Sequence, residues 1–123
     1  MSEIITYLRD TLAANAIITN GAGNYSAWVH RYYRYQKMHT QLAPTSGSMG
    51  YGLPAAIAAK LREPKREVIC FAGDGCLQMT MQEFGTACQH NAAMIVIVVD
   101  NEMYGTILMH QKSAPAGGFL PRG

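Results

Sequence analysis

The sequence has little charge and no long hydrophobic run, and these two absences exclude several classes of protein. Charged residues make up 15% of the 123 positions, the formal net charge is +2, and Lys and Arg form no run. Nucleic acid is therefore not expected as a partner. The longest apolar stretch, MIVIVV at 94–99, is far shorter than a bilayer span, so we expect no membrane partner either.

Cysteine usage and the first residues both indicate an intracellular protein. The three cysteines, Cys70, Cys76 and Cys88, form no CxxC pair and have no histidine at metal-ligand spacing. Their odd number does not suit a disulfide framework, so we expect reduced, buried or half-buried thiols. The first ten residues carry two acids and lack the apolar core of a signal peptide, which makes the cytoplasm the expected compartment.

The hydrophobic residues that are present follow an α/β pattern. They make up 49% of the chain, which is a globular composition, and 123 residues suffice for one domain with its own core. Strand-like and helix-like segments alternate along the chain: AIIT at 16–19, a helical turn or two at 28–32, AAIAAKL at 55–61, VICFA at 68–72, TMQEFGTACQH at 80–90 and MIVIVV at 94–99. The sequence therefore predicts one α/β domain over residues 1–123, with a mostly parallel sheet flanked by helices.

Two segments of this pattern carry more detailed expectations. The run 94–99 is apolar on both faces, which is typical of a strand in the middle of a parallel sheet. Residues 112–123 contain SAPAGGFLPRG, whose proline and glycine content predicts an irregular loop or tail.

Two of the predicted strands end in oxygen-bearing side chains. Asp74, in the triplet GDG, follows VICFA, and Asp100-Asn101 follows MIVIVV. Asp74 and Asn101 are 27 positions apart, one strand–helix–strand circuit, so adjacent parallel strands would bring both side chains to the rim where ligands bind in open sheets. A carboxylate, an amide oxygen and a nearby carbonyl suit Mg²⁺, and Gly73 and Gly75 would let the backbone approach an anion. An ordinary turn at GDG is the alternative that these residues leave open.

Three separated segments resemble the diphosphate-binding domain of thiamine diphosphate enzymes. GDG followed by an asparagine that closes an apolar strand resembles the cofactor motif of the family, NEMYGTI at 101–107 looks like its continuation, and TSGSMGYGLPAAIAAKL at 45–61 looks like its other marked segment. The likeness covers residues 21–111 and is closest to the acetolactate synthase and benzoylformate decarboxylase branch. One departure is that the common Asn-Asn end of the motif is Asp100-Asn101 here.

The resemblance implies the thiamine diphosphate-binding fold and a set of cofactor and metal ligands. Asp74 and Asn101 would bind Mg²⁺ through their side chains and Met103 through its carbonyl, and the ion would bridge the two phosphates. Met49 would lie under the bend of the cofactor and force it into a V shape, while the carbonyl of Gly47 would accept a hydrogen bond from its amino group; these two are the implied catalytic positions. The remaining implied contacts to the diphosphate are Asn24, Tyr25 and Gly73, together with the backbone amides of Gly75, Cys76, Leu77, Tyr104 and Gly105. Asn24 as a plain turn residue and Met49 as core filler remain the alternatives.

The resemblance also implies a role in a 2-oxo acid decarboxylase or carboligase, with acetolactate formation from pyruvate as the first expectation. The glutamate that activates the cofactor would come from a pyrimidine-binding domain, usually on a partner subunit, because no glutamate here, Glu83 included, has a supporting context. We therefore expect an isolated chain that is inactive, exposed apolar surfaces that favour a homo-oligomer, and a domain that is a piece of a larger enzyme, truncated at its C-terminus where relatives continue.

Three other functions are weighed against this one. The first is a non-catalytic assembly domain that keeps the fold, and the second is one subunit of a naturally split 2-oxo acid decarboxylase. The third, an unrelated nucleotide-binding α/β protein, fits poorly. There is no GxxxxGK[ST] loop, and GAGNYS at 21–26 is not a full dinucleotide fingerprint.

Overall fold

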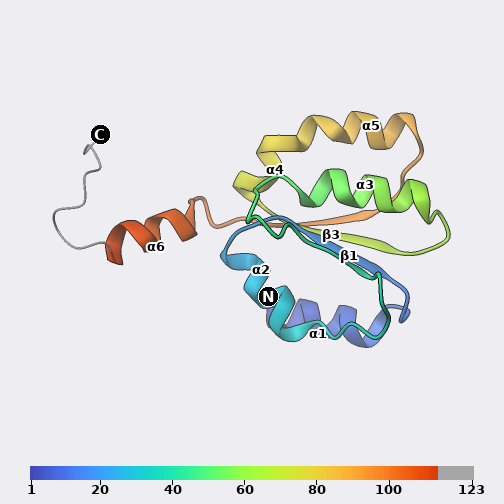
Figure 1. The fold of residues 1–123 in the computed structure, drawn as a ribbon, viewed down its shortest axis with the longest axis horizontal. Coiled ribbons are helices and arrows are strands. Elements are labelled where there is room, and N and C mark those ends of the chain that lie inside the picture. Colours follow the sequence, from blue (N-terminus) through green and yellow to red (C-terminus); the bar gives the residue numbers. More distant parts are fainter. Residues whose placement is uncertain (114–123) are drawn as a thin grey trace.

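The computed structural model describes residues 1–113, which form three layers, with a sheet between two layers of helices (Figure 1). In chain order the elements are α1 (Ser2–Thr11), β1 (Ile17–Asn20), α2 (Asn24–Tyr32), β2 (Gln41–Leu42), α3 (Gly52–Arg62), β3 (Val68–Gly73), α4 (Asp74–Thr80), the 3-10 helix η1 (Met81–Glu83), α5 (Phe84–Gln89), β4 (Ile95–Val99) and α6 (Gly105–Ser113). The four strands are parallel, in the order β2-β1-β3-β4. Helices α1 and α2 cover one face, and α3, α4 and α5 lie on the other. The predicted α/β class is confirmed. Among the described residues, none of the helices has the length and apolar character needed to span a bilayer.

Side chains along β3 alternate between two buried cores, one on each face of the sheet. Val68, Cys70 and Ala72 belong to the core on the α3 side, whereas Ile69 and Phe71 belong to the core under α1 and α2. All five are at most 3% exposed. Burial on both faces explains why this strand reads as an uninterrupted apolar run.

The three cysteines are free thiols, as the sequence predicts. Cys70 and Cys76 are buried, as expected, whereas Cys88 is exposed on α5, which corrects the expectation of a buried or half-buried thiol at that position. Burial raises the pKa of the Cys70 thiol to about 11, so it stays protonated at neutral pH. Cys70 is therefore a packing residue rather than a reactive thiol.

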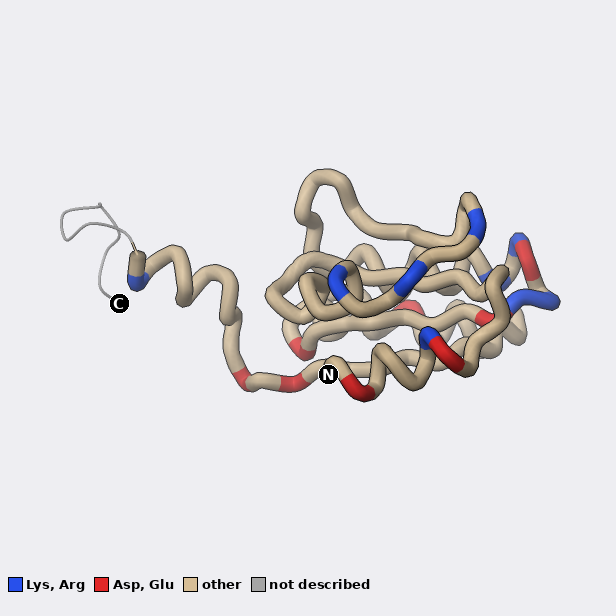
Figure 2. The backbone as a smooth tube through the Cα atoms, turned by 90° about the horizontal axis from the view of Figure 1, so that it is seen from below, with Lys and Arg blue, Asp and Glu red and all other residues tan. Residues whose placement is uncertain are grey.

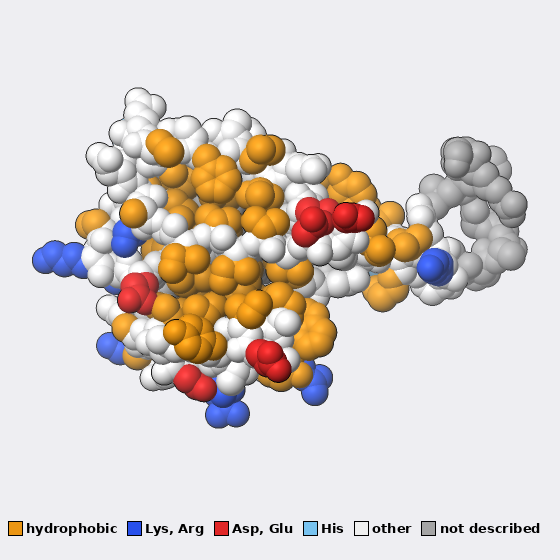
Figure 3. Space-filling view, turned by 180° about the vertical axis from the view of Figure 1, so that it is seen from behind, with side chains coloured by type: hydrophobic (Ala, Val, Ile, Leu, Met, Phe, Trp, Pro, Cys, Tyr) orange, Lys and Arg blue, Asp and Glu red, His pale blue; other side chains and the backbone are white. Residues whose placement is uncertain are grey.

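β4 lies at the edge of the sheet, which corrects the expectation that 94–99 forms a central strand. Within residues 1–113 it pairs with β3 alone. Its side chains Ile95 and Val98 are 56% and 44% exposed. Seen from behind, apolar side chains form a broad band across this side of the molecule (Figure 3). An apolar run shows that both faces of a strand suit burial, but it carries no information on which strands lie beside it.

Two helical boundaries also differ from the sequence-based expectation. The helix expected at 80–90 begins already at Asp74 and is interrupted by η1, because Thr80 leaves the helical region with φ −135° and ψ 13°. Residues 112–113, expected in an irregular tail, form the end of α6, where the Ser113 hydroxyl donates to the Met109 carbonyl at 2.7 Å. Residues 114–123 of the expected tail lie outside the described residues.

β1 and α3 meet at Gly52, where there is no room for a side chain. A Cβ added at Gly52 would lie 3.0 Å from the Asn20 carbonyl carbon and 3.0 Å from the Gly21 nitrogen. We expect Gly52→Ala to lower the free energy of unfolding by about 1–3 kcal/mol, because backbone must shift to relieve the contact. Gly85 in α5 is the matched control: a Cβ there meets nothing within 4 Å, and Gly85→Ala should raise stability by up to about 1 kcal/mol. Urea unfolding followed by circular dichroism measures both changes, and a similar effect at the two positions would contradict this explanation.

Candidate functional site

A cavity of about 430 Å³ opens at the carboxyl ends of β1, β3 and β4, which is the size of a small-molecule site. Its wall includes all but one of the residues that the resemblance implies as cofactor or metal contacts: Asn24, Tyr25, Gly47, Met49, Gly73, Asp74, Gly75, Cys76, Asn101, Met103, Tyr104 and Gly105. The structure thus brings together four stretches that are far apart in the sequence. The exception is Leu77, whose side chain packs against the core on the α3 side, so that only its main-chain amide suits the implied role.

The expected adjacency of the two polar strand ends is confirmed. β3 and β4 are parallel neighbours, and Gly73 lies opposite Val99 in the register. Asp74 and Asn101 therefore leave the sheet at the same rim, and both line the cavity. Asp74 is half-buried as the first residue of α4, whereas Asn101 is exposed.

The Asp74 carboxylate has no partner within residues 1–113: it makes neither a capping hydrogen bond nor a salt bridge. None of the described residues that line the cavity is Lys, Arg or His. Figure 2 shows that the tube between the sheet and α6 carries acidic residues but no basic ones. A carboxylate that has no protein partner is available as an oxygen ligand for a bound cation. In the described part of the chain no three His, Cys, Asp or Glu side chains gather to hold a metal by themselves, so a cation here would take its other ligands from amide, carbonyl or external oxygens.

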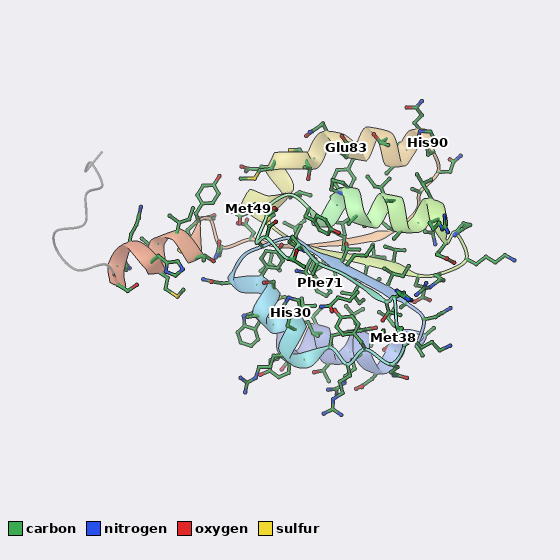
Figure 4. All side chains as sticks on the ribbon, in the orientation of Figure 1. His30, Met38, Met49, Phe71, Glu83 and His90 are labelled. Atoms are coloured by element: carbon green, nitrogen blue, oxygen red, sulfur yellow. The ribbon has the colours of Figure 1, made fainter. Side chains whose placement is uncertain are left out.

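The loop after β4 folds back over the start of α4. The Asn101 side-chain oxygen accepts the Met103 amide at 3.2 Å, which closes a short turn. A Cβ added at Gly75 would lie 2.7 Å from the Tyr104 ring and 3.3 Å from the Met49 terminal methyl. Tyr104 and Met49 thus converge on the first turn of α4, and Figure 4 shows Met49 near the end of the sheet that faces α6.

Met49 is held in place by the attachment of its loop to α4. The Thr80 hydroxyl donates to the Gly50 carbonyl at 2.9 Å. Gly50 has φ 81°, a conformation that favours glycine, and a Cβ there would lie 3.2 Å from Met79 Cβ. The loop therefore presents Met49, half-buried, to the cavity.

A second cluster ties the turn after β1 to α4. The Cys76 thiol donates to the Ala22 carbonyl at 2.9 Å, and the Tyr25 hydroxyl lies 3.6 Å from the Cys76 sulfur. Burial, reinforced by Cys76, raises the pKa of Tyr25, so its phenol stays neutral at physiological pH. These partners are 51 and 54 positions apart, and local sequence patterns gave no signal for the thiol contacts.

Glu83 does not belong to the site. Its carboxylate accepts the Thr86 hydroxyl at 2.8 Å, in the outer helical layer (Figure 4). Among the described residues no glutamate lines the cavity. Further wall residues that sequence patterns did not single out are Ala22, Gly23, Trp28, Val99, Thr106 and Ile107.

Comparison with known proteins agrees with this geometry. The family model "Thiamine pyrophosphate enzyme, C-terminal TPP binding domain" matches residues 21–119. The acetolactate synthase isozyme 1 large subunit of Escherichia coli (strain K12) is 41% identical over 101 residues, covering 81% of this chain and 18% of that protein. The acetolactate synthase large subunit of Lactococcus lactis subsp. lactis (strain IL1403) is 36% identical over 112 residues, covering 90% of this chain and 20% of that protein.

A solved structure extends the likeness to the fold. The thiamine diphosphate-dependent 4-hydroxybenzoylformate decarboxylase of Rhodococcus jostii RHA1 matches with a TM-score of 0.81 and 25% sequence identity, covering 94% of this chain and 23% of that one. The chain spans about a fifth of the length of these relatives. From the family model and these relatives, we conclude that the chain belongs to the C-terminal TPP-binding domains of thiamine pyrophosphate enzymes, in the acetolactate synthase and benzoylformate decarboxylase-like branch.

Proposed function

We propose that this chain binds thiamine diphosphate through a Mg²⁺ ion, as the diphosphate-binding domain of an acetolactate synthase-like decarboxylase or carboligase. The observation that carries the proposal is the half-buried Asp74 carboxylate, which has no partner within residues 1–113 and shares its rim with Asn101. A diphosphate beside this carboxylate needs a cation between them, because two like unit charges 4 Å apart repel by about 4 kcal/mol at an effective dielectric constant of 20.

The donor set around Asp74 suits Mg²⁺. The carboxylate of Asp74, the side-chain oxygen of Asn101 and the main-chain carbonyl of Met103 are hard oxygen ligands, and Mg²⁺ usually leaves its other positions to water and phosphate oxygens. The Asn101 oxygen already accepts the Met103 amide, and an amide oxygen keeps a second lone pair for a metal.

The rest of the cavity suits the organic part of the cofactor. Trp28, Val99 and Ile107 give it apolar walls, and Met49 approaches the first turn of α4, where it would support the bent cofactor. The Gly47 carbonyl would orient the aminopyrimidine ring. When bound, thiamine diphosphate supplies the electron sink that 2-oxo acid chemistry requires.

The cavity is incomplete for catalysis without a second domain. No glutamate and no basic side chain of the described residues lines it, so both the activating glutamate and the group that binds a 2-oxo acid carboxylate would come from elsewhere. A pyrimidine-binding partner domain is the proposed source, and the isolated chain would be inactive. The exposed apolar face around β4 supports association with further protein, as in a homo-oligomer (Figure 3).

A titration with and without metal tests the proposal. Trp28, the single tryptophan of the chain, lines the cavity, so its fluorescence reports occupancy. We expect thiamine diphosphate to bind roughly 100- to 1,000-fold more weakly in EDTA than in Mg²⁺, because the repulsion from Asp74 is then no longer neutralised. Thiamine, which lacks the diphosphate, is the control and should show no such metal dependence. Equal affinity for thiamine diphosphate in EDTA and in Mg²⁺ would contradict the proposal.

A further inference from the structure

One hydrogen bond joins the segment after β4 to the start of α2, at the wall of the cavity. The Thr106 hydroxyl donates to the Asn24 side-chain oxygen at 2.8 Å, between residues 82 positions apart. We call this bond the clasp. Among the side-chain hydrogen bonds of residues 1–113, the only other one from the segment 101–113 to an earlier residue is local, from the Glu102 amide to Asp100. Both residues of the clasp line the cavity.

The clasp determines which way the Asn24 amide points. Because the Asn24 oxygen accepts from Thr106, the amide nitrogen is on the other side of the group. This nitrogen lies 3.1 Å from where a Cβ of Gly105 would be, and the amide nitrogen of Asn101 lies 3.4 Å from the same point. Neither nitrogen donates a hydrogen bond within the described residues. Two amide donors are therefore gathered beside Gly105 in the cavity wall, where an anionic oxygen can accept from them.

The geometry points to Thr106 as a positioning residue for the cofactor site. Its hydroxyl fixes the Asn24 amide so that the nitrogen can donate to a phosphate oxygen, and the same bond holds the loop 101–106 beside α2. Without the Thr106 hydroxyl, the Asn24 amide can rotate about its terminal torsion, which has a broad energy minimum, and its oxygen and nitrogen can exchange places. The identity of the ligand as a phosphate rests on the proposed function, whereas the clasp itself does not.

The segment that the clasp holds is otherwise weakly packed. No residue of α6 is buried, and α6 extends away from the three layers (Figure 1). A single hydrogen bond makes a modest net contribution to stability, so its loss should increase local opening of 101–113 roughly two- to tenfold.

Three variants distinguish the effect of the Thr106 hydroxyl from the effect of the side-chain shape. Thr106→Val keeps the branched shape and removes the donor, whereas Thr106→Ser keeps the donor. Thr86→Val is the matched control, since it removes a hydrogen bond of the same 2.8 Å length, to Glu83, in the outer helical layer.

Hydrogen–deuterium exchange on the ligand-free chain tests the clasp without any cofactor. We expect the amides of 101–113 to exchange roughly two- to tenfold faster in Thr106→Val, and at the wild-type rate in Thr106→Ser and Thr86→Val. Unchanged exchange in Thr106→Val, or equally fast exchange in Thr106→Ser, would overturn the inference that the clasp holds the segment 101–113.

Trp28 fluorescence titration with thiamine diphosphate and Mg²⁺ tests the positioning role. Thr106→Val should weaken binding roughly two- to tenfold, and Thr106→Ser should restore it. Faster exchange with unchanged affinity would overturn the positioning role while keeping the clasp. If the wild-type chain itself bound no thiamine diphosphate, both the proposed function and the positioning role would be wrong. The exchange measurement would still test whether the clasp holds the segment 101–113.

Discussion

Asp74→Ala is expected to weaken the Mg²⁺-dependent binding of thiamine diphosphate by at least about 100-fold, which corresponds to about 2.7 kcal/mol. Asp74 carries the one charged side chain among the described residues that line the cavity. Its removal leaves a cation there with neutral oxygens only, from Asn101 and Met103, and these bind Mg²⁺ far more weakly than a carboxylate does. Calorimetric titration with thiamine diphosphate at constant Mg²⁺ measures the loss.

Asp100 provides the matched control for Asp74. It too follows a strand, but its oxygen accepts the Glu102 amide at 3.0 Å and it does not line the cavity. Asp100→Ala should change the affinity by less than about fivefold, since exposed charges interact weakly. The free energy of unfolding of both variants should lie within about 1 kcal/mol of the wild-type value. Asp74 has no ion pair to lose, and a carboxylate at a helix start contributes little to stability. Equal losses of affinity in the two variants would show a general charge effect and refute the metal-ligand assignment.

The position of the site could be predicted from the sequence because it depends on local signals and one simple rule of topology. The apolar runs before Asp74 and before Asn101 indicate strands, and their spacing of one strand–helix–strand circuit predicts parallel neighbours. The register of Gly73 with Val99 bears this out. The same runs could not reveal that β4 is the edge strand, because the strand beside β4 is determined by the rest of the fold rather than by its own residues.

Contacts between distant side chains are the part that the sequence could not predict. Thr106 and Asn24 are separated by 82 positions, and neither stands in a pattern that indicates the other. The thiol of Cys76 likewise contacts the turn at Ala22 from 54 positions away. Leu77 packs its side chain against the core on the α3 side, which leaves its implied role, a contact through the main-chain amide, as a prediction.

Phe71→Ala is expected to lower the free energy of unfolding by about 3–5 kcal/mol, a large share of the total for a domain of this size. Phe71 is fully buried in β3, between the sheet and the helices α1 and α2, where it packs with Ile5 and Val29 (Figure 4). Phe84→Ala in α5 is the control, since Phe84 is 38% exposed. This variant should lower the free energy of unfolding by only about 1 kcal/mol. Chemical denaturation measures both losses, and a comparable loss at Phe84 would contradict this account of the core.

The core around Phe71 also supports the cavity wall, so the same variant tests whether core and site are coupled. Tyr25 and Cys76 belong to this core and line the cavity as well. A ligand that binds only the folded state adds about 2.7 kcal/mol of stability at a hundredfold excess over its dissociation constant. We expect saturating Mg²⁺ and thiamine diphosphate to stabilise Phe71→Ala and the wild type by equal amounts, because Tyr25 remains held by Cys76. A smaller increment in Phe71→Ala would show that the cavity wall moves with the core, and that Phe71 shapes the site as well as stabilising the fold.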